Sequence, residues 1–310
     1  MATTTVALVQ AGGMTDDLAG NLAVLSELIT AAAAPDASGA VPDLVVLPEL
    51  STTPYFCGGD GTDRGDWAQP VPGHTTEVFG ALARELGCAI AFGMFERAAD
   101  GTTYNSVVVI DAEGHPLRWD APDGSTLPAY RKLSLPRSLV GDVRIDEKRY
   151  FSPGPAPATV ELGGVRFGCV ICYDRSFPEN WAVARALGAT VMLAVVSSLG
   201  TREALFLAEL QSRAMESQMW VVAVNRAGPE TLDGATVDYF GLSCVIAPDG
   251  TVVAQAPAHR AGPILRCRLD LDAVSAARAG LPLGRDRRPD VVRLLADLTA
   301  NAATRPGQAA

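Results

Sequence analysis

The sequence predicts an α/β protein in which helices cover β-sheets. Short apolar runs rich in β-branched residues recur along the chain, helical patterns lie between them, and 48% of the 310 residues are apolar, which is enough for a large core. No convincing domain boundary interrupts this order. We therefore expect a single domain over residues 1–295 and a flexible C-terminal tail over residues 296–310.

Nine runs are expected to be buried strands because they are short, apolar and bounded by Gly, Pro or Asp. They cover residues 4–10, 43–50, 88–96, 105–111, 165–174, 189–198, 219–228, 242–255 and 262–270. Two stretches, 105–119 and 242–256, place a Gly-containing turn between strand formers and are expected to be hairpins. Their comparable places in the two halves of the chain indicate a two-layer sheet arrangement with internal pseudo-symmetry.

Helical patterns fill the intervals between these strands. The five expected helices cover residues 15–34, 75–87, 177–188, 202–218 and 287–302. Thr15 is expected to cap the first helix, Gly87 to end the second, and Pro178 to open the third. The long connection over residues 137–158 is expected to be a functional loop.

The net charge of the chain bears on which molecules it can bind. The net charge is −10 and the isoelectric point is about 4.8, which argues against nucleic acid or an anionic membrane as a partner. The first residues have no basic segment followed by an apolar one, and no run approaches the roughly 18 apolar residues of a membrane span. We expect a cytoplasmic protein whose six cysteines are reduced thiols.

Two cysteines three positions apart, Cys169 and Cys172, allow three interpretations. A structural zinc site needs four ligands, but the chain has one such pair and three scattered histidines. A redox pair normally opens a helix, whereas Cys169 lies inside an apolar run. In the third interpretation Cys172 alone is a nucleophile, at a strand-to-helix turn where backbone N–H groups can bind an oxyanion. A half-buried turn residue remains the alternative.

A nucleophilic thiol needs a base, and the histidines give no support for a Cys–His pair. Glu49 follows the apolar run "DLVVLP" and could serve as that base, although a salt-bridge role would also explain it. Lys132, in "YRKLSLP", could stabilise an oxyanion, but a single lysine in this setting is more often a solvated surface residue.

Taken together, these stretches resemble the nitrilase superfamily, the carbon–nitrogen hydrolases with a Glu–Lys–Cys triad. The resemblance is carried by "VVLPEL", "YRKLSLP" and "GCVICYDRSFPE" in this order. Further similarity lies in "DEKRYFSPG", "WAVARALGA", "VVAVNRAG" and "LSCVIAPDGTVVA", so it spans most of the chain. The motifs are most similar to the branches that hydrolyse N-carbamoyl amino acids and N-carbamoyl amines.

The resemblance implies a role for each matched residue. Glu49 would be the general base, Cys172 the nucleophile and Lys132 the stabiliser of the tetrahedral intermediate, with Glu147 orienting the lysine and the substrate. The backbone N–H of Tyr173 would complete the oxyanion site. Substrate contacts are expected from Arg175, Ser197 and Tyr55. Neither a metal nor an organic cofactor is required.

The resemblance also implies an αββα sandwich of four layers, whose subunits pair into αββααββα, so we expect a homodimer or a larger homo-oligomer. Asp174 stands where nitrilases proper tend to have glutamate, which favours amide over nitrile substrates. Arg175 could clasp a substrate carboxylate or could instead pair with the following helix. Ser134 replaces a usual histidine and Ser176 replaces a second arginine, and both weaken an N-carbamoyl-D-amino-acid assignment.

A small linear amide or ureido compound is therefore the expected substrate. The alternatives are a nitrilase that converts a small nitrile and an inactive scaffold of the same fold.

Overall fold

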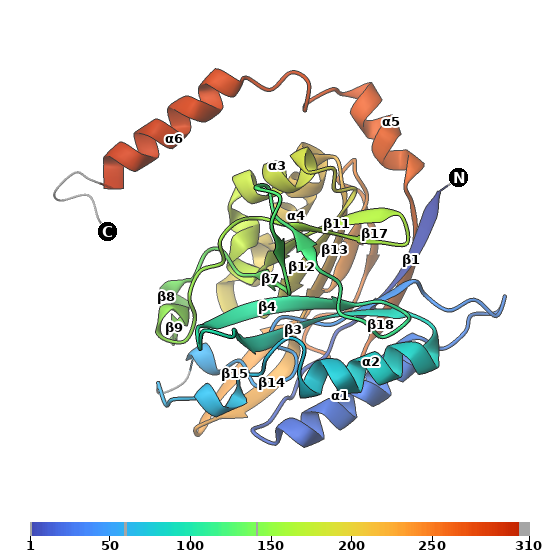
Figure 1. The fold of residues 1–310 in the computed structure, drawn as a ribbon, viewed down its shortest axis with the longest axis vertical. Coiled ribbons are helices and arrows are strands. Elements are labelled where there is room, and N and C mark those ends of the chain that lie inside the picture. The colour runs from blue at the N-terminus through green and yellow to red at the C-terminus, as the bar shows by residue number, and fades with distance from the viewer. Residues whose placement is uncertain (1, 59–60, 141, 304–310) are drawn as a thin grey trace.

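The computed structural model describes residues 2–58, 61–140 and 142–303, which form two mixed β-sheets flanked by helices (Figure 1). In the first sheet the parallel strands β1, β2 and β3 lie between antiparallel neighbours. Its order is β18 (Ile264–Asp270), β1 (Thr3–Val9), β2 (Leu44–Val46), β3 (Ala89–Arg97), β4 (Thr103–Ile110) and β7 (Tyr130–Arg131).

The second sheet repeats this plan, with three parallel strands, β11, β12 and β13, at its centre. Its order is β17 (Val252–Gln255), β16 (Cys244–Ile246), β13 (Trp220–Asn225), β12 (Val191–Val196), β11 (Val165–Ile171), β10 (Thr159–Leu162), β5 (Trp119–Asp120) and β6 (Thr126–Leu127). Every one of the nine expected strand regions contains a strand. The predicted pseudo-symmetry agrees with the presence of three parallel strands at the centre of each sheet.

Helices cover the outer face of each sheet, and the inner faces pack against one another. Helices α1 (Leu18–Ala32) and α2 (His74–Leu86) share a core with the first sheet, and α3 (Pro178–Ala186) and α4 (Glu203–Ser217) share one with the second. The core between the sheets contains Val46, Trp119, Phe167 and Leu193, all at most 1% exposed. The order of layers is therefore helix, sheet, sheet, helix.

One expectation about local structure is wrong, and another holds only in part. Asp17, not Thr15, caps α1, because its Oδ1 accepts the backbone N–H of Gly20 at 3.0 Å. The stretch 105–119 forms the expected hairpin only next to its turn, where Pro116 pairs with Ile110 and the Leu117 N–H donates to the Val109 carbonyl at 2.8 Å. Trp119 instead joins the second sheet, where its ring is fully buried between the sheets. Burial of this large ring outweighs continued pairing.

The predicted loop 137–158 contains the hairpin of β8 (Arg137–Val140) and β9 (Val143–Asp146). A second hairpin, of β14 (Ala227–Leu232) and β15 (Ala235–Phe240), was not predicted. These pairings lie outside the two main sheets, so their sequences lack the long apolar runs that mark buried strands.

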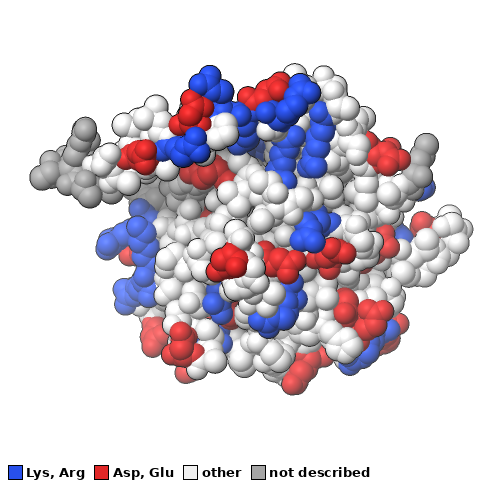
Figure 2. Space-filling model, turned by 45° about the horizontal axis from the view of Figure 1, so that its top comes forward, with Lys and Arg blue, Asp and Glu red and all other residues white. Residues whose placement is uncertain are grey.

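The C-terminal region forms an arm. Helix α5 (Asp272–Gly280), which was not predicted, leads to α6 (Pro289–Ala303), which is set apart from the sheets (Figure 1). Helix α6 crosses the expected boundary at residue 295, and residues 304–310 of the expected tail lie outside the described residues. Basic side chains gather near the C-terminal arm with acidic ones among them, and both signs are spread over the rest of this face (Figure 2).

Within the described residues, no helix has the length and apolar character needed to cross a membrane.

Candidate active site

The ends of several strands place the predicted catalytic side chains together. Glu49 follows β2, Lys132 follows β7, and Glu147 follows β9, and all three side chains are fully buried. Lys132 Nζ lies 2.7 Å from Glu49 Oε1 and 2.6 Å from Glu147 Oε1. Cys172 follows β11, close enough for the charges of all three to act on its thiol.

Each carboxylate of this cluster keeps one oxygen unpaired. Glu49 Oε1 also accepts from Asn105 Nδ2 at 2.8 Å, and Glu147 Oε1 also accepts from the Tyr55 hydroxyl at 2.7 Å. The Oε2 atoms of both glutamates are buried without a hydrogen-bond partner in the described chain. Buried carboxylate oxygens normally have partners, so these two atoms mark positions from which a thiol, a water or a substrate N–H can be bound.

Burial and the charges of neighbouring groups together shift the pKa values of the cluster. Burial alone would lower the pKa of Lys132, but Glu147 and Glu49 together raise it well above its usual value, so the amine stays protonated. Burial raises the pKa of Glu147 to about 7, while Lys132 acts in the opposite direction. The cluster therefore holds a buried ammonium beside a carboxyl group whose pKa lies above its ordinary value because of burial.

Cys172 sits in a strained backbone conformation at the start of the 3₁₀ turn Cys172–Ser176. Its φ of 47° lies in the left-handed region, which costs a non-glycine residue about 1–3 kcal/mol. Arg175 Nη1 donates to the Cys172 carbonyl at 2.9 Å, and Asp174 Oδ2 accepts the Ile171 N–H at 3.3 Å. These bonds hold the turn that presents the thiol.

The thiol of Cys172 requires a base. Burial raises its pKa to about 11, and Glu49 adds to this effect, while Lys132 and Arg175 oppose it. The side chain is still partly exposed at a cavity, whereas Cys169 is 2% exposed in the core between the sheets. Both cysteines are free thiols. Of the two, only Cys172 lines the cavity and is accessible to a ligand.

The turn that carries Glu49 is held by a buried arginine. Leu50, next to Glu49, has a φ of 45°. Arg226 Nη2 donates to the carbonyls of Glu49 at 3.1 Å and Leu50 at 2.8 Å. Its Nη1 is paired with Glu230. Glu230 in turn accepts the backbone N–H of Tyr55 at 2.7 Å. This network fixes both Glu49 and Tyr55.

Gly93 on β3 lies directly beneath the same turn. A Cβ at this position would lie 2.5 Å from the Leu50 nitrogen and 2.7 Å from the Glu49 Cα. Both atoms belong to the backbone, so they cannot move aside as a flexible side chain would. The close approach of β3 to Glu49 therefore requires glycine.

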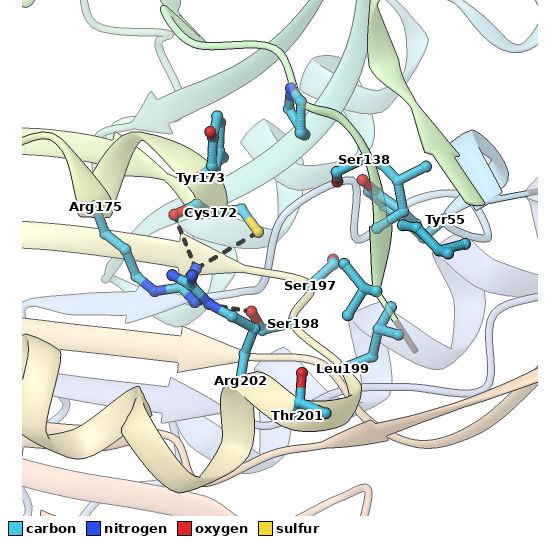
Figure 3. A pocket seen from close by; sticks show the side chains of 14 residues that line it. Tyr55, Ser138, Cys172, Tyr173, Arg175, Ser197, Ser198, Leu199, Thr201 and Arg202 are labelled. Atoms are coloured by element: carbon cyan, nitrogen blue, oxygen red, sulfur yellow. Dashed lines mark hydrogen bonds between the residues drawn. The ribbon is translucent and has the colours of Figure 1, made fainter. Parts of the chain in front are cut away.

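The thiol opens into a cavity of about 250 Å³, shown in Figure 3. Arg175 and Arg202 lie on one side of it, and Tyr55 and Ser138 lie on the other. Apolar side chains supply much of the remaining surface, namely Pro136, Leu139, Val140, Ile145, Tyr173 and Leu199. This volume suits a small molecule rather than a polymer.

The sequence matches the family model described as carbon–nitrogen hydrolase over residues 5–279. The chain belongs to this family, which is part of the nitrilase superfamily. It is 32% identical to an N-carbamoylputrescine amidase of Solanum lycopersicum, over 92% of each chain. It is 31% identical to a citrullinase of Francisella tularensis, over 94% of this chain and 97% of that one.

The structure of a carbon–nitrogen hydrolase from Helicobacter pylori shares the fold, with a TM-score of 0.80 and 24% identity over 95% of this chain and 98% of that one. The protein is therefore a carbon–nitrogen hydrolase of the amidase or N-carbamoyl amidohydrolase type.

The three residues expected to contact the substrate all line the cavity of this hydrolase, but their polar atoms are already engaged. The Ser197 hydroxyl donates to the Glu49 carbonyl at 3.1 Å, and the Tyr55 hydroxyl donates to Glu147. Arg175 is 1% exposed and its Nε lies 3.0 Å from Glu209 Oε2. The ion pair of Arg175 is therefore with a helix, as one of its two expected roles required, but with α4 rather than with the following helix, α3.

Arg175 also reaches the Cys172 thiol directly. Its Nη1 lies 3.7 Å from Cys172 Sγ, and its Nη2 donates to the Ser198 hydroxyl at 3.0 Å. With every nitrogen of the guanidinium in use, this arginine orients the thiol rather than clasping a substrate. Tyr173 is the second residue of the 3₁₀ turn, and N–H groups at the start of such a turn have no partner within it.

Sequence reasoning missed several residues that support the site. Asn105 and Arg226 bond to Glu49 from β4 and from the end of β13. Asp174 was singled out only for its bearing on the substrate, and its structural role was missed: it accepts the N–H groups of Leu133 at 3.2 Å and Ser134 at 2.7 Å. A polar residue at the edge of an apolar run is the signal that could have found them. None of the three histidines lines the cavity.

Substituting Gly93→Ala is expected to displace the Glu49 turn. Overpacking should lower the free energy of unfolding by about 1–3 kcal/mol, and the misplaced carboxylate should reduce turnover by at least about tenfold. Urea unfolding and steady-state kinetics measure the two effects. Gly280→Ala is the matched control, because no neighbouring heavy atom lies within 4 Å of its added Cβ. Wild-type stability and turnover in Gly93→Ala would contradict the assignment.

Substituting Arg175→Met is expected to raise the pKa of the Cys172 thiol, because the guanidinium stabilises the thiolate. The pH profile of alkylation by iodoacetamide should therefore move to higher pH. Arg166→Met, which removes a guanidinium bound to Asp120 and Glu161 instead, should leave the profile in place. A profile that stays unchanged or moves to lower pH in Arg175→Met would show that Arg175 does not act on the thiol.

Proposed function

We propose that this hydrolase cleaves the C–N bond of a small linear amide or N-carbamoyl compound through a thioester on Cys172. The observation that carries the proposal is the buried Glu49–Lys132–Glu147 cluster beside the thiol. Burying two carboxyls and an ammonium is costly for stability, and such clusters are typical of functional sites.

The first half of the reaction forms the thioester. The unpaired Glu49 Oε2 takes the thiol proton, and sulfur attacks the carbonyl carbon of the substrate. Lys132 and the Tyr173 N–H stabilise the negative charge that develops on the carbonyl oxygen. The C–N bond then breaks, and the leaving nitrogen receives the proton from Glu49. Ammonia or an amine departs, and Cys172 retains the acyl or carbamoyl group.

The second half releases the product. Glu49 takes a proton from water, and the water oxygen attacks the thioester carbon. The C–S bond breaks and the proton returns to sulfur, which regenerates the thiol and frees an acid or a carbamate. Glu147 keeps Lys132 in place and offers its own Oε2 to a substrate N–H.

Fewer contacts in the site bear on the choice between ureido and carboxamide substrates than on the reaction itself. The names of the two relatives described above refer to ureido substrates. Ser134 stands where the carbamoyl-cleaving branches have histidine, and only its backbone N–H is engaged, by Asp174. Asp174 bridges two backbone turns here, in the place of the glutamate of nitrilases. We therefore include both amide classes in the proposal.

Assays of ammonia release with N-carbamoyl compounds, carboxamides and nitriles test this proposal. We expect turnover of amide or ureido members, and we expect Cys172→Ala to abolish it while the variant keeps wild-type thermal unfolding. Conversion of a nitrile to an acid without any amide turnover would favour a nitrilase instead. Wild-type activity in Cys172→Ala would show that another group is the nucleophile.

We also propose that two copies of the chain pair, with α6 contributing to the contact. Five apolar side chains of this helix are 55–61% exposed, namely Val291, Val292, Leu294, Leu295 and Leu298. An apolar surface of this kind is typical of a protein interface, and the short span from α5 to α6 lets the helix reach a neighbouring subunit.

Light scattering after size exclusion should give a mass of at least twice the 32.3 kDa chain. The double variant Leu294→Ser and Leu295→Ser should shift the mass toward one chain, because it removes two apolar contacts. Ala296→Ser, on the same helix, should leave the mass unchanged. A wild-type protein that is monomeric at micromolar concentration would contradict the pairing.

A further inference from the structure

The cavity wall beside Cys172 carries more positive than negative charge. Arg175 and Arg202 lie next to each other on this wall (Figure 3), and both interact with the single carboxylate of Glu209 on α4. Glu209 Oε2 lies 3.0 Å from Arg175 Nε and 3.3 Å from Arg202 Nη2. Two guanidinium groups thus share one carboxylate, which leaves one surplus positive charge.

The carboxylate of Glu209 is paired more closely with Arg175 than with Arg202. Its Oε1 accepts a hydrogen bond of 2.6 Å from the Ser176 hydroxyl, while its contacts to Arg202 are 3.3 and 3.4 Å long. Burial would raise the pKa of Glu209, but Arg175, Ser176 and Arg202 together lower it, so the carboxylate stays charged. The incompletely compensated charge therefore lies on Arg202.

Arg202 keeps part of its guanidinium available to a ligand. Its side chain is 38% exposed, and within the described chain all of its hydrogen bonds start from Nη2, to Ser176 and Glu209. Nε and Nη1 therefore remain as donors, and Arg202 lines the same cavity as the thiol. A guanidinium donates two parallel hydrogen bonds to a carboxylate.

No acidic side chain among the described residues lines this cavity to balance Arg202. Glu203, the next residue in the chain, pairs with His259 at 3.3 Å and is not part of the wall. Glu49 and Glu147 are fully buried around Lys132. The described wall thus offers hydroxyl groups from Ser138, Ser198 and Thr201, but no carboxylate that would pair with an ammonium.

From these contacts we infer that Arg202 makes the hydrolase select small amide or ureido substrates whose non-reacting end is a carboxylate, and reject those that end in an amine. The inference rests on the proposed function and names the substrate class of the same site. Arg202 acts here as a specificity-determining residue, because it meets the far end of the substrate while Cys172 attacks the carbonyl carbon. The positively charged end of an N-carbamoyl diamine would instead face Arg202.

Three ureido compounds of matched length separate these possibilities. They are 4-ureidobutyrate, n-butylurea and (3-aminopropyl)urea, which present a carboxylate, a methyl group and an ammonium at the same position. The corresponding carboxamides, glutaramate, pentanamide and 4-aminobutanamide, form a second series with the same three ends. Both series are measured by ammonia release with the full-length enzyme, with Cys172→Ala as the blank.

We expect kcat/KM to be about tenfold to a hundredfold higher for the carboxylate than for the methyl compound, as for a hydrogen bond between charged groups. The ammonium compound should fall below the methyl compound. Because Arg202 is partly exposed, the preference should shrink as salt is added.

Two variants test whether Arg202 is responsible. Arg202→Met should reduce the advantage of the carboxylate compound over the methyl compound to about threefold or less, because the guanidinium that binds the carboxylate is gone. Arg202→Glu should favour the ammonium compound. A loss shared equally by all three compounds would show that Arg202 only supports the fold, and would overturn the inference.

The experiment separates this inference from the proposed function. Turnover of the methyl compound with no preference for the carboxylate, or with preference for the ammonium, would overturn the inference alone. If wild-type enzyme turns over no compound of either series above the Cys172→Ala blank, while iodoacetamide still labels Cys172 rapidly, both the amide specificity and the inference drawn from it are wrong.

Discussion

The buried contact of Lys132 with Glu49 and Glu147 is the constraint on which the site depends. Transfer of each charged group from water costs several kcal/mol, and only short, well-oriented hydrogen bonds offset this cost. The contacts of 2.6 and 2.7 Å supply them. Glu49 and Lys132 follow strands of the first sheet, Glu147 follows the β8–β9 hairpin, and Cys172 follows a strand of the second sheet. The cluster therefore meets the thiol only if both sheets and this hairpin are correctly placed. It therefore ties catalytic geometry to the integrity of the whole domain.

Two buried arginines hold the turns that present the reacting groups. Leu50 and Cys172 both adopt left-handed backbone conformations, which an unsupported chain would leave. Arg226 bonds to the carbonyls beside Glu49, and Arg175 bonds to the carbonyl of Cys172. Each arginine is itself neutralised by a carboxylate, from Glu230 or Glu209. The strained backbone at Leu50, beside Glu49, and at Cys172 is thus stabilised in the same way, by a buried arginine that is paired with a carboxylate.

Much of the fold could be predicted because its main strands are buried on both faces, and such strands appear in the sequence as short apolar runs. The hairpin that was predicted over residues 105–119 forms only in part, because the end of this segment has its partner far along the chain. The residues 105–119 contain a turn typical of a hairpin, yet Trp119 lies in the second sheet. Its ring is buried in the core between the two sheets. The β8–β9 and β14–β15 hairpins lie outside the main sheets and give no such pattern.

The sequence by itself determined which chemical groups stand at the strand ends: Glu49, Lys132, Glu147 and Cys172, each beside a recognisable motif. Tertiary structure alone decided how they and their neighbours pair. Arg175 was open to a substrate carboxylate or to a helix, and the packing of α4 places Glu209 against it. The same packing leaves Arg202 with only a share of that carboxylate. Local sequence cannot reveal this, because the balance of charge on a cavity wall depends on which distant side chains the folded layers bring within hydrogen-bonding distance.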